Sequence, residues 1–183
     1  MGIRDNQIHS VRFFPKWDIN DPRQVTGLIQ LCLDLVKLGT DLEGVEIGSL
    51  YGESTNIFLS FPHIKKLTCV DLTIQSRFTK RLANWIADKR VHPLEMGSAT
   101  AADLFEDSSL DFVYIDADHS YAAVKSDLEA WYPKLKPNGI LSGHDYGSAF
   151  KDDVIKAVDE FLKLHNLQLK QYPDSSWAAI KAQ

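Results

Sequence analysis

Two glycines and a pair of hydroxyl residues follow a short apolar run in segment 44–55, a pattern typical of a ligand-binding loop between a strand and a helix. Gly48 allows a sharp turn off the strand, Gly52 allows close approach to a ligand, and Ser54 can satisfy backbone donors at the helix start. A dinucleotide-binding loop has the spacing G-x-G-x-x-G, whereas here the spacing is Gly48-x-x-x-Gly52. Because Glu46 would also repel phosphate, we expect a cationic or neutral ligand.

Asp71 ends the next apolar run of the chain, residues 66–71. A carboxylate at the tip of a strand can accept two hydrogen bonds from a ribose diol, and charge-assisted bonds of this kind contribute about 1.5–3 kcal/mol each. A solvated aspartate at a strand end is the alternative interpretation. The combination of Asp71 with the glycine loop favours the ribose interpretation.

Asp116, Asp118 and His119 bring two carboxyl groups and an imidazole together within four residues. Such crowding is costly unless a positive group joins the carboxylates. Histidine side chains exchange protons near neutral pH, so His119 is a candidate general base. The alternatives are that His119 caps a helix or is merely exposed, and that Asp118 caps the helix expected to start near Ser120.

These residues are expected at the ends of strands that alternate with helices. Short apolar centres predict strands at Val45–Ile47, Leu67–Val70, Phe112–Ile115 and Gly139–Leu141. Helices are expected at Pro22–Leu38, Ser54–Ser60, Gln75–Asp88, Ala101–Phe105, Tyr121–Leu135 and Phe150–His165. Two final strands, Gln168–Tyr172 and Trp177–Lys181, should form an antiparallel hairpin. The pattern predicts a doubly wound, mainly parallel α/β sheet in one domain, residues 22–183, after an irregular N-terminal arm, residues 1–21.

The composition excludes several classes of protein. Of 183 residues, 44% are hydrophobic and 25% charged, close to the averages for globular proteins, which excludes a disordered chain, a fibrous repeat and a disulfide miniprotein. The net charge of −5 argues against a nucleic-acid binder, which needs a basic face. Cys32 and Cys69 lie in apolar segments and are expected to be reduced. With neither a secretory signal nor a bilayer-crossing stretch evident, we expect a cytoplasmic protein without membrane contact.

The chain resembles a known family of enzymes. The pattern Glu-x-Gly-x-x-x-Gly-x-Ser at 46–54, followed by Asp71, resembles the class I S-adenosylmethionine-dependent methyltransferases over about residues 41–181. Within that class, Ile115–Tyr121 and Ser142–Tyr146 are similar to the small O-methyltransferases. These include the catechol and caffeoyl-coenzyme A type and bacterial enzymes of sugar and antibiotic pathways. The resemblance implies a seven-stranded Rossmann-like fold, and methyl transfer from S-adenosylmethionine to an oxygen of a small hydroxyl-bearing acceptor.

The resemblance also implies a set of cofactor-binding residues. The methionine end would be held by the glycine loop, the ribose by Asp71, and the adenine by the loop that follows the third strand. Leu72 either packs on the adenine or belongs to the core. The full set is Glu46, Gly48, Ser49, Gly52, Ser54, Asp71, Leu72, Gly97, Ser98, Ala99 and Asp116.

A divalent metal site is the further implication, because the resembling enzymes bind a cation with the aspartate that corresponds to Asp116. They complete the site with two oxygen ligands after the fifth strand, where this chain has His144 and Asp145. Oxygen ligands suit Mg²⁺, whereas an imidazole shifts the preference toward transition metals. In this interpretation Asp116 and His119 are catalytic, and His119 removes the acceptor proton. The alternative is that His144 and Asp145 bind the substrate without a metal.

Two other functions remain open. A nicotinamide-dependent oxidoreductase on a similar sheet is disfavoured by the missing G-x-G-x-x-G spacing. A non-catalytic domain that binds S-adenosylmethionine is disfavoured by the intact set of Glu46, Asp71 and Asp116. The N-terminal arm, residues 1–21, is either a lid over the substrate pocket, as related methyltransferases have, or a packed arm or dimer contact. A homodimer is therefore one of the expected states.

Overall fold

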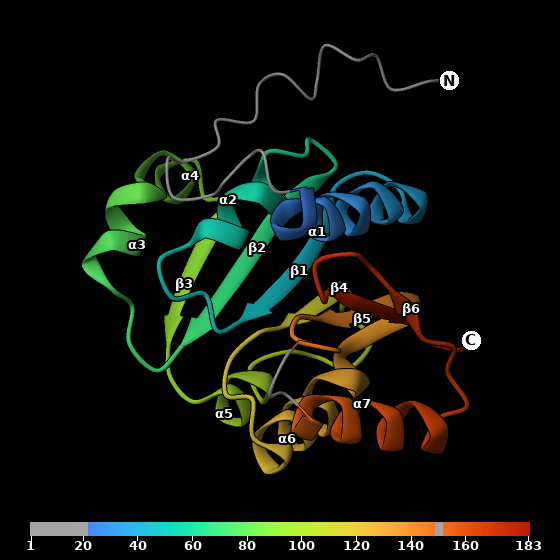
Figure 1. Cartoon of the computed structure of the whole chain (residues 1–183). Coiled ribbons are helices and arrows are strands. Elements are labelled where there is room, and N and C mark those ends of the chain that lie inside the picture. The colour runs from blue at the N-terminus through green and yellow to red at the C-terminus, as the bar shows by residue number, and fades with distance from the viewer. Residues whose placement is uncertain (1–21, 149–151) are drawn as a thin grey trace.

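A seven-stranded sheet forms the centre of the computed structural model, which describes residues 22–148 and 152–183 (Figure 1). The strand order is β3-β2-β1-β4-β5-β7-β6. The strands are β1 (Leu42–Ile47), β2 (Ile64–Asp71), β3 (Val91–Glu95), β4 (Leu110–Ile115), β5 (Leu135–Gly143), β6 (Lys170–Gln171) and β7 (Trp177–Ile180). Strands β1 to β5 are parallel to one another, whereas β7 runs antiparallel to both β5 and β6. The predicted doubly wound sheet with its C-terminal hairpin is confirmed, while the predicted arm at residues 1–21 lies outside the described residues.

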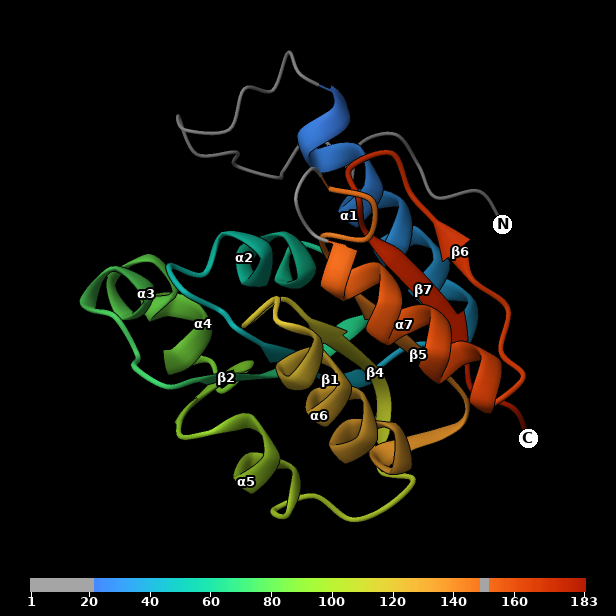
Figure 2. The same cartoon turned by 60° about the horizontal axis from the view of Figure 1, so that its bottom comes forward.

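Helices cover both faces of the sheet (Figures 1 and 2). One layer holds α1 (Pro22–Leu35), α2 (Glu53–Leu59), α3 (Ser76–Arg81) and α4 (Ala83–Ala87), and the other holds α5 (Ser98–Ala102), α6 (Tyr121–Trp131) and α7 (Asp152–Leu164). Short 3-10 helices follow α1 at Val36–Leu38 and α6 at Tyr132–Lys134.

Alternating side chains of the strands build two separate cores. In β4, Phe112 and Tyr114 pack toward α1 and α2, whereas Val113 and Ile115 pack toward α6 and α7. Successive strand residues point to opposite faces, so a strand buried on both sides is continuously apolar. This explains why four of the five parallel strands are visible as short apolar runs in the sequence.

Several elements differ from the sequence prediction: no apolar run predicts β3, the helix expected over Ala101–Phe105 is α5 at Ser98–Ala102, and two further elements are divided or shortened. The helix expected over Gln75–Asp88 is divided into α3 and α4 at Leu82, whose backbone leaves the helical region at φ −102° and ψ 13°. The buried Leu82 side chain lies against the position of Gly52, so tertiary packing decides the break. The strand expected over Gln168–Tyr172 is shortened to Lys170–Gln171. Among the described residues, no helix combines the length and the apolar character needed to cross a bilayer.

The sheet reverses its winding between β1 and β4. The chain proceeds outward from β1 through β2 to β3, and from β4 to β5 on the opposite side. Ile47 pairs with Ile115, so the residues that follow, Gly48 and Asp116, emerge side by side from the sheet. Ligands of open α/β sheets bind outside the carboxyl ends of the strands at such a reversal. The fold therefore places the candidate site between the ends of β1 and β4.

Candidate functional site

A cavity of about 630 Å³ lies at the carboxyl ends of β1 to β5. This volume falls within the range of small-molecule sites, roughly 300–1,000 Å³. Of the predicted site residues, the cavity wall contains Gly48, Ser49, Ser54, Asp71, Leu72, Ser98, Asp116, His119 and His144. Glu46, Gly52, Gly97, Ala99 and Asp145 are not part of that wall. The structure thus gathers residues at the ends of five strands, β1 to β5, into one space.

Gly48 is required by its surroundings as well as by its backbone. Its φ of +85° lies in the left-handed region, which disfavours side chains. A Cβ at this position would lie 2.1 Å from the carbonyl oxygen of Asp116 and 2.6 Å from Cα of Ala117. The backbone amide of Gly48 also donates to the carbonyl of Val70 over 2.8 Å. The glycine loop is therefore pressed directly against the end of β4.

Gly52 faces protein rather than the cavity, contrary to its predicted role in ligand approach. A Cβ here would lie 2.7 Å from Cδ1 of Leu82 and 3.1 Å from Cδ2 of Phe78, and the residue has φ +73°. Gly52 directly precedes α2, and its amide donates to the carbonyl of Ser49 over 2.7 Å. The residue therefore allows the loop to pack against α3 and α4.

Glu46 is fully buried beneath the glycine loop. The hydroxyls of Ser54 and Thr55, on the first turn of α2, both donate to its carboxylate. Burial raises the pKa of Glu46 to about 6, although these hydroxyls act in the opposite direction and Asp116 adds to the rise. In this structure Glu46 holds the start of α2 against β1. It contacts Ser54 of the cavity wall but is not itself part of that wall.

Asp71 lies at the tip of β2 and faces the cavity. Its Oδ2 accepts the amide of Leu50 over 2.9 Å, and its Oδ1 accepts the amide of Thr73 over 3.2 Å. Each carboxylate oxygen can accept a further hydrogen bond. The side chain is thus fixed in position and retains the acceptor capacity that the ribose assignment requires.

Beyond β2, the cavity is bordered by Leu72, Met96 and Ser98. Leu72 is 77% exposed, so the interpretation of this residue as part of the core is wrong. An exposed leucine on a cavity rim is available to pack against the face of a flat ligand. Ser98 begins α5 directly after the loop that follows β3.

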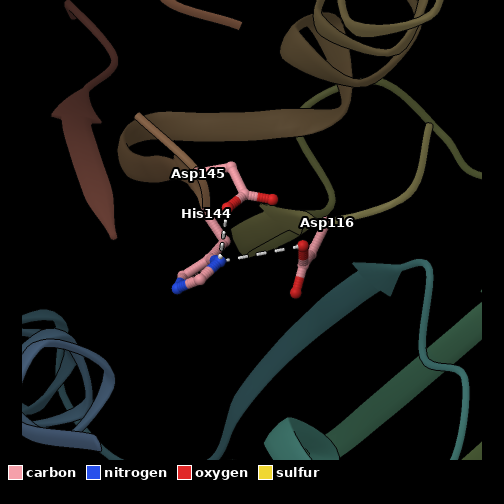
Figure 3. A group of neighbouring side chains, drawn as sticks. All are labelled: Asp116, His144 and Asp145. Atoms are coloured by element: carbon pink, nitrogen blue, oxygen red, sulfur yellow. Dashed lines mark ion pairs between the residues drawn. The ribbon is translucent and has the colours of Figure 1, made fainter. Parts of the chain in front are cut away.

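Asp116, His144 and Asp145 form a compact cluster at the ends of β4 and β5 (Figure 3). Potential ligand atoms of all three lie within 4.8 Å of one another. Nδ1 of His144 is 3.5 Å from Oδ1 of Asp145 and 4.0 Å from Oδ1 of Asp116. Asp145 adopts φ +62°, a conformation that aspartate tolerates better than most residues. The predicted trio is therefore brought together in space.

The two carboxylates determine the charge of His144. Burial opposes protonation, but the hydrogen bond with Asp145 and the charges of Asp116 and Asp145 outweigh it and raise the pKa of His144 to about 9. The hydrogen bond from His144 in turn holds the pKa of Asp145 well below its usual range. At neutral pH the cluster therefore contains a positive group between two negative ones.

His119 contacts the same cluster from the loop that follows β4. Its Nε2 lies 2.6 Å from Oδ2 of Asp145 and 3.6 Å from Oδ1 of Asp116. The carboxylate of Asp118 accepts the amide of Ser120 over 2.7 Å, but Ser120 itself is the N-cap residue of α6 and no side chain caps the helix, so Asp118 fixes the turn before α6 and the prediction that it caps this helix is wrong. His119 is thus oriented toward the carboxylates and also contributes to the cavity wall.

Several cavity residues were not predicted from the sequence. Leu28 of α1, Tyr114 of β4, Asp127 of α6 and Asp174 of the β6–β7 connection also line the cavity. Asp174 is buried and accepts the amides of Leu28 and Ser176 over 2.8 and 3.0 Å. Its position depends on the meeting of two distant segments, which no local pattern reveals.

Comparisons with known proteins agree with this geometry. The sequence model of a family described as a methyltransferase domain matches residues 45–146, more than half of the chain. Among curated proteins, the uncharacterized protein y4gI of Sinorhizobium fredii is 47% identical over 45 residues, a match that takes in 25% of this chain. The match spans only 5% of the length of that relative.

Solved structures share the fold at low identity. A candidate caffeoyl-coenzyme A O-methyltransferase from Staphylococcus aureus is 18% identical, with a TM-score of 0.69 and coverage of 97% of this chain and 90% of that one. The O-methyltransferase NovP is 15% identical, with a TM-score of 0.68 and coverage of 85% and 78%. The 1,6-didemethyltoxoflavin-N1-methyltransferase of Burkholderia thailandensis, solved with S-adenosylhomocysteine, is 17% identical, with a TM-score of 0.60 and coverage of 90% and 84%.

Proposed function

The chain belongs to the family of methyltransferase domains, and we propose that it transfers the methyl group of S-adenosylmethionine to an oxygen of a small hydroxyl-bearing acceptor, with a divalent cation at Asp116, His144 and Asp145. The observation that carries this proposal is the position of that cluster. It lies at the ends of β4 and β5, beside the glycine loop and His119, and two of its residues, Asp116 and His144, line the same cavity as Asp71. A donor site and a group that could activate a hydroxyl thus meet in one space.

The donor side of the cavity fits S-adenosylmethionine, which supplies a methyl group carried on a positively charged sulfur. Gly48 and Ser49 border the cavity where the glycine loop packs against the end of β4, and Asp71 presents carboxylate oxygens to the same cavity. Among the described residues, the cavity wall contains no lysine or arginine. Carboxylates without basic residues favour a cationic donor over a phosphate-bearing cofactor, which also disfavours the nicotinamide alternative.

The donor atoms of the cluster fit a divalent cation. Two carboxylates and one imidazole, with ligand atoms within 4.8 Å of one another, match the ligand types of transition-metal sites. The protonated imidazole of His144 supplies the positive charge between the two carboxylates. A divalent cation bound there would supply that positive charge instead. A bound cation would lower the pKa of an acceptor hydroxyl and stabilise the resulting alkoxide.

The residues of the protein have two functions in this proposal. Methyl transfer proceeds in line, so the loop at Gly48 and the carboxylate of Asp71 must hold the donor in a fixed position facing the acceptor. His119 removes the acceptor proton. Its Nε2 lies 2.6 Å from Oδ2 of Asp145, so Nδ1 is the nitrogen that we assign to accept the proton.

O-methylation is supported by the similarity to structures named as O-methyltransferases, together with the acid–imidazole cluster. The acceptor that we propose is a small molecule rather than a nucleic acid, because the chain carries a net charge of −5. A second chain completing the open side of the cavity, as a homodimer, is part of the same proposal. A non-catalytic domain that binds the donor is the alternative that the following experiment distinguishes.

The experiment measures S-adenosylhomocysteine by mass spectrometry after incubation with S-adenosylmethionine and a panel of catechols, sugars and phenols. We expect turnover with at least one acceptor, loss of turnover in excess chelator, and recovery when Mg²⁺ or Mn²⁺ is restored. Asp116→Asn should reproduce the effect of the chelator, whereas Asp103→Asn, an exposed change of equal charge, should not. Full activity in excess chelator would remove the metal from the mechanism, and donor binding without turnover on any acceptor would favour the non-catalytic domain.

A further inference from the structure

Asp127 is a buried carboxylate on the cavity wall that the proposed chemistry does not use. It belongs to α6, is 6% exposed and borders the cavity together with Ala123, which lies one helical turn before it. Trp131, one turn after it, is completely buried. Residues four apart lie on the same face of a helix, so this face of α6 is turned toward the cavity, which Ala123 and Asp127 border, and toward α5, where Trp131 contacts Ser98. Figure 2 shows α6 and α5 on the same side of the sheet.

A short chain of hydrogen bonds holds the carboxylate in place. The indole Nε1 of Trp131 donates to Oγ of Ser98 over 2.9 Å, which leaves the Ser98 hydroxyl hydrogen for the carboxylate of Asp127. Burial raises the pKa of Asp127, the Ser98 bond opposes this, and the charge of Asp118 raises it further. None of these contacts supplies a cation. Burying a carboxylate without a charged partner is costly unless a ligand provides hydrogen-bond donors.

The position of Asp127 corresponds to one end of the donor. The sheet order places the ends of β1, β2 and β3 in a row, with the glycine loop after β1 and Asp71 at the tip of β2. A ligand with its ribose at Asp71 and its amino-acid end at the glycine loop extends its base toward the end of β3. Met96, Ser98 and Asp127 border the cavity there, and Leu72 is exposed on its rim.

The loop after β3 does not itself provide a carboxylate in this region. It consists of Met96 and Gly97, and the hydroxyl of Ser98, the first residue of α5, is already engaged by Trp131 and Asp127. Asp118 also borders the cavity near Asp127, but it is exposed and accepts the amide of Ser120, so Asp127 of α6 is the buried carboxylate that faces this part of the cavity. The edge of adenine that carries the 6-amino group presents two N–H donors, the chemistry that a carboxylate recognises.

We propose that Asp127 accepts a hydrogen bond from the 6-amino group of the donor's adenine and thereby selects adenine over other bases. The inference rests on the proposed use of S-adenosylmethionine. In this arrangement Leu72 and Met96 pack against the purine, Asp127 recognises its edge, and Ser98 with Trp131 holds Asp127 in position. A role for Asp127 that is confined to the fold would not produce any preference for the 6-amino group.

The test compares two ligands by calorimetry: S-adenosylhomocysteine, and its analogue with hydrogen in place of the 6-amino group. A hydrogen bond to a charged acceptor predicts that the wild-type protein binds the analogue roughly tenfold to a hundredfold more weakly. In Asp127→Ala the two affinities should agree within about threefold, because the acceptor is gone. Asp127→Asn, which keeps an uncharged acceptor, should retain a smaller preference.

The control is Glu129→Gln, which removes one negative charge from the exposed side of the same helix and should keep the full preference. Equal binding of both ligands by the wild-type protein would overturn the role of Asp127, and this comparison does not depend on how any variant folds. A full preference retained in folded Asp127→Ala would also overturn it. Failure of the wild-type protein to bind S-adenosylhomocysteine at all would instead refute the proposed function on which the inference rests.

Discussion

The buried carboxyl group of Glu46 should make the stability of the fold depend on pH in a direction opposite to that of most carboxylates. Burial raises the pKa of Glu46 from 4.5 to about 6. Between these two values the folded protein holds a proton that the unfolded chain has released. The free energy of unfolding therefore falls as the pH rises through this window, and stays lower above it. Replacing Glu46 with glutamine removes this dependence.

The magnitude follows from the size of the shift. One pKa unit corresponds to about 1.4 kcal/mol, so a rise from 4.5 to about 6 costs about 2 kcal/mol once Glu46 is ionised. The amide of Glu46→Gln keeps an oxygen for one of the two hydroxyls, those of Ser54 and Thr55, and presents its NH₂ to the other. Any change in these contacts is the same at every pH. The stability of the variant relative to wild type should thus rise by about 2 kcal/mol between pH 4.5 and pH 7.

Urea unfolding followed by tryptophan fluorescence at half-unit steps from pH 4.5 to pH 7 measures this difference directly. The fully buried Trp131 and Trp177 both belong to the core under α6 and α7 and should report its loss. Glu106→Gln, which removes an exposed carboxyl, controls for the loss of one negative charge. A variant-minus-wild-type difference that stays constant with pH, or that falls as the pH rises, would refute the assignment of a raised pKa to Glu46.

Three further changes test the donor site and the fold. Gly48→Ala should destabilise the protein by more than about 2 kcal/mol in urea unfolding and weaken S-adenosylhomocysteine binding, because the new Cβ meets the Asp116 carbonyl. The control Gly147→Ala, also at positive φ but in open space, should destabilise the protein less. Asp71→Ala should weaken S-adenosylhomocysteine binding at least severalfold, and unchanged affinity by calorimetry would contradict the ribose assignment. Asp34→Asn should lower the Tm at pH 6, because the hydrogen-bond partners of Asp34 outweigh its burial and lower its pKa to about 2. The difference in Tm between variant and wild type should disappear as the pH falls toward 2, and a difference that persists at low pH would contradict this.

The order of strands and helices could be predicted because burial on both faces gives parallel strands a continuous apolar sequence. β3 lacked that signal, since Val91–Glu95 contains Pro93 and forms an edge of the sheet, where proline is tolerated. The break between α3 and α4 at Leu82 was also missed. It depends on packing against the loop at Gly52, which local helix propensity does not include.

The candidate site could be predicted only where its residues directly follow strands. Asp116, His144 and Asp145 were found in this way, because the carboxyl ends of parallel strands meet at one edge. Asp127 and Asp174 were missed because their places on the cavity wall depend on how α6 and the β6–β7 connection pack. A signal for Asp127 was nevertheless present. It occupies a position on the same buried side of α6 as neighbouring apolar residues, where an aspartate is unexpected.

The contacts of the two loop glycines show a different role from the one expected from the sequence. Both were expected to serve the turn and the ligand, yet Gly48 makes room for the backbone of Asp116, and Gly52 makes room for Leu82. The loop is thereby held between the end of β4 on one side and the junction of α3 and α4 on the other. In-line methyl transfer depends on the distance between donor and acceptor. Because Asp116 also belongs to the acid–imidazole cluster, the missing side chain at position 48 sets how closely the donor loop approaches the groups proposed to activate the acceptor.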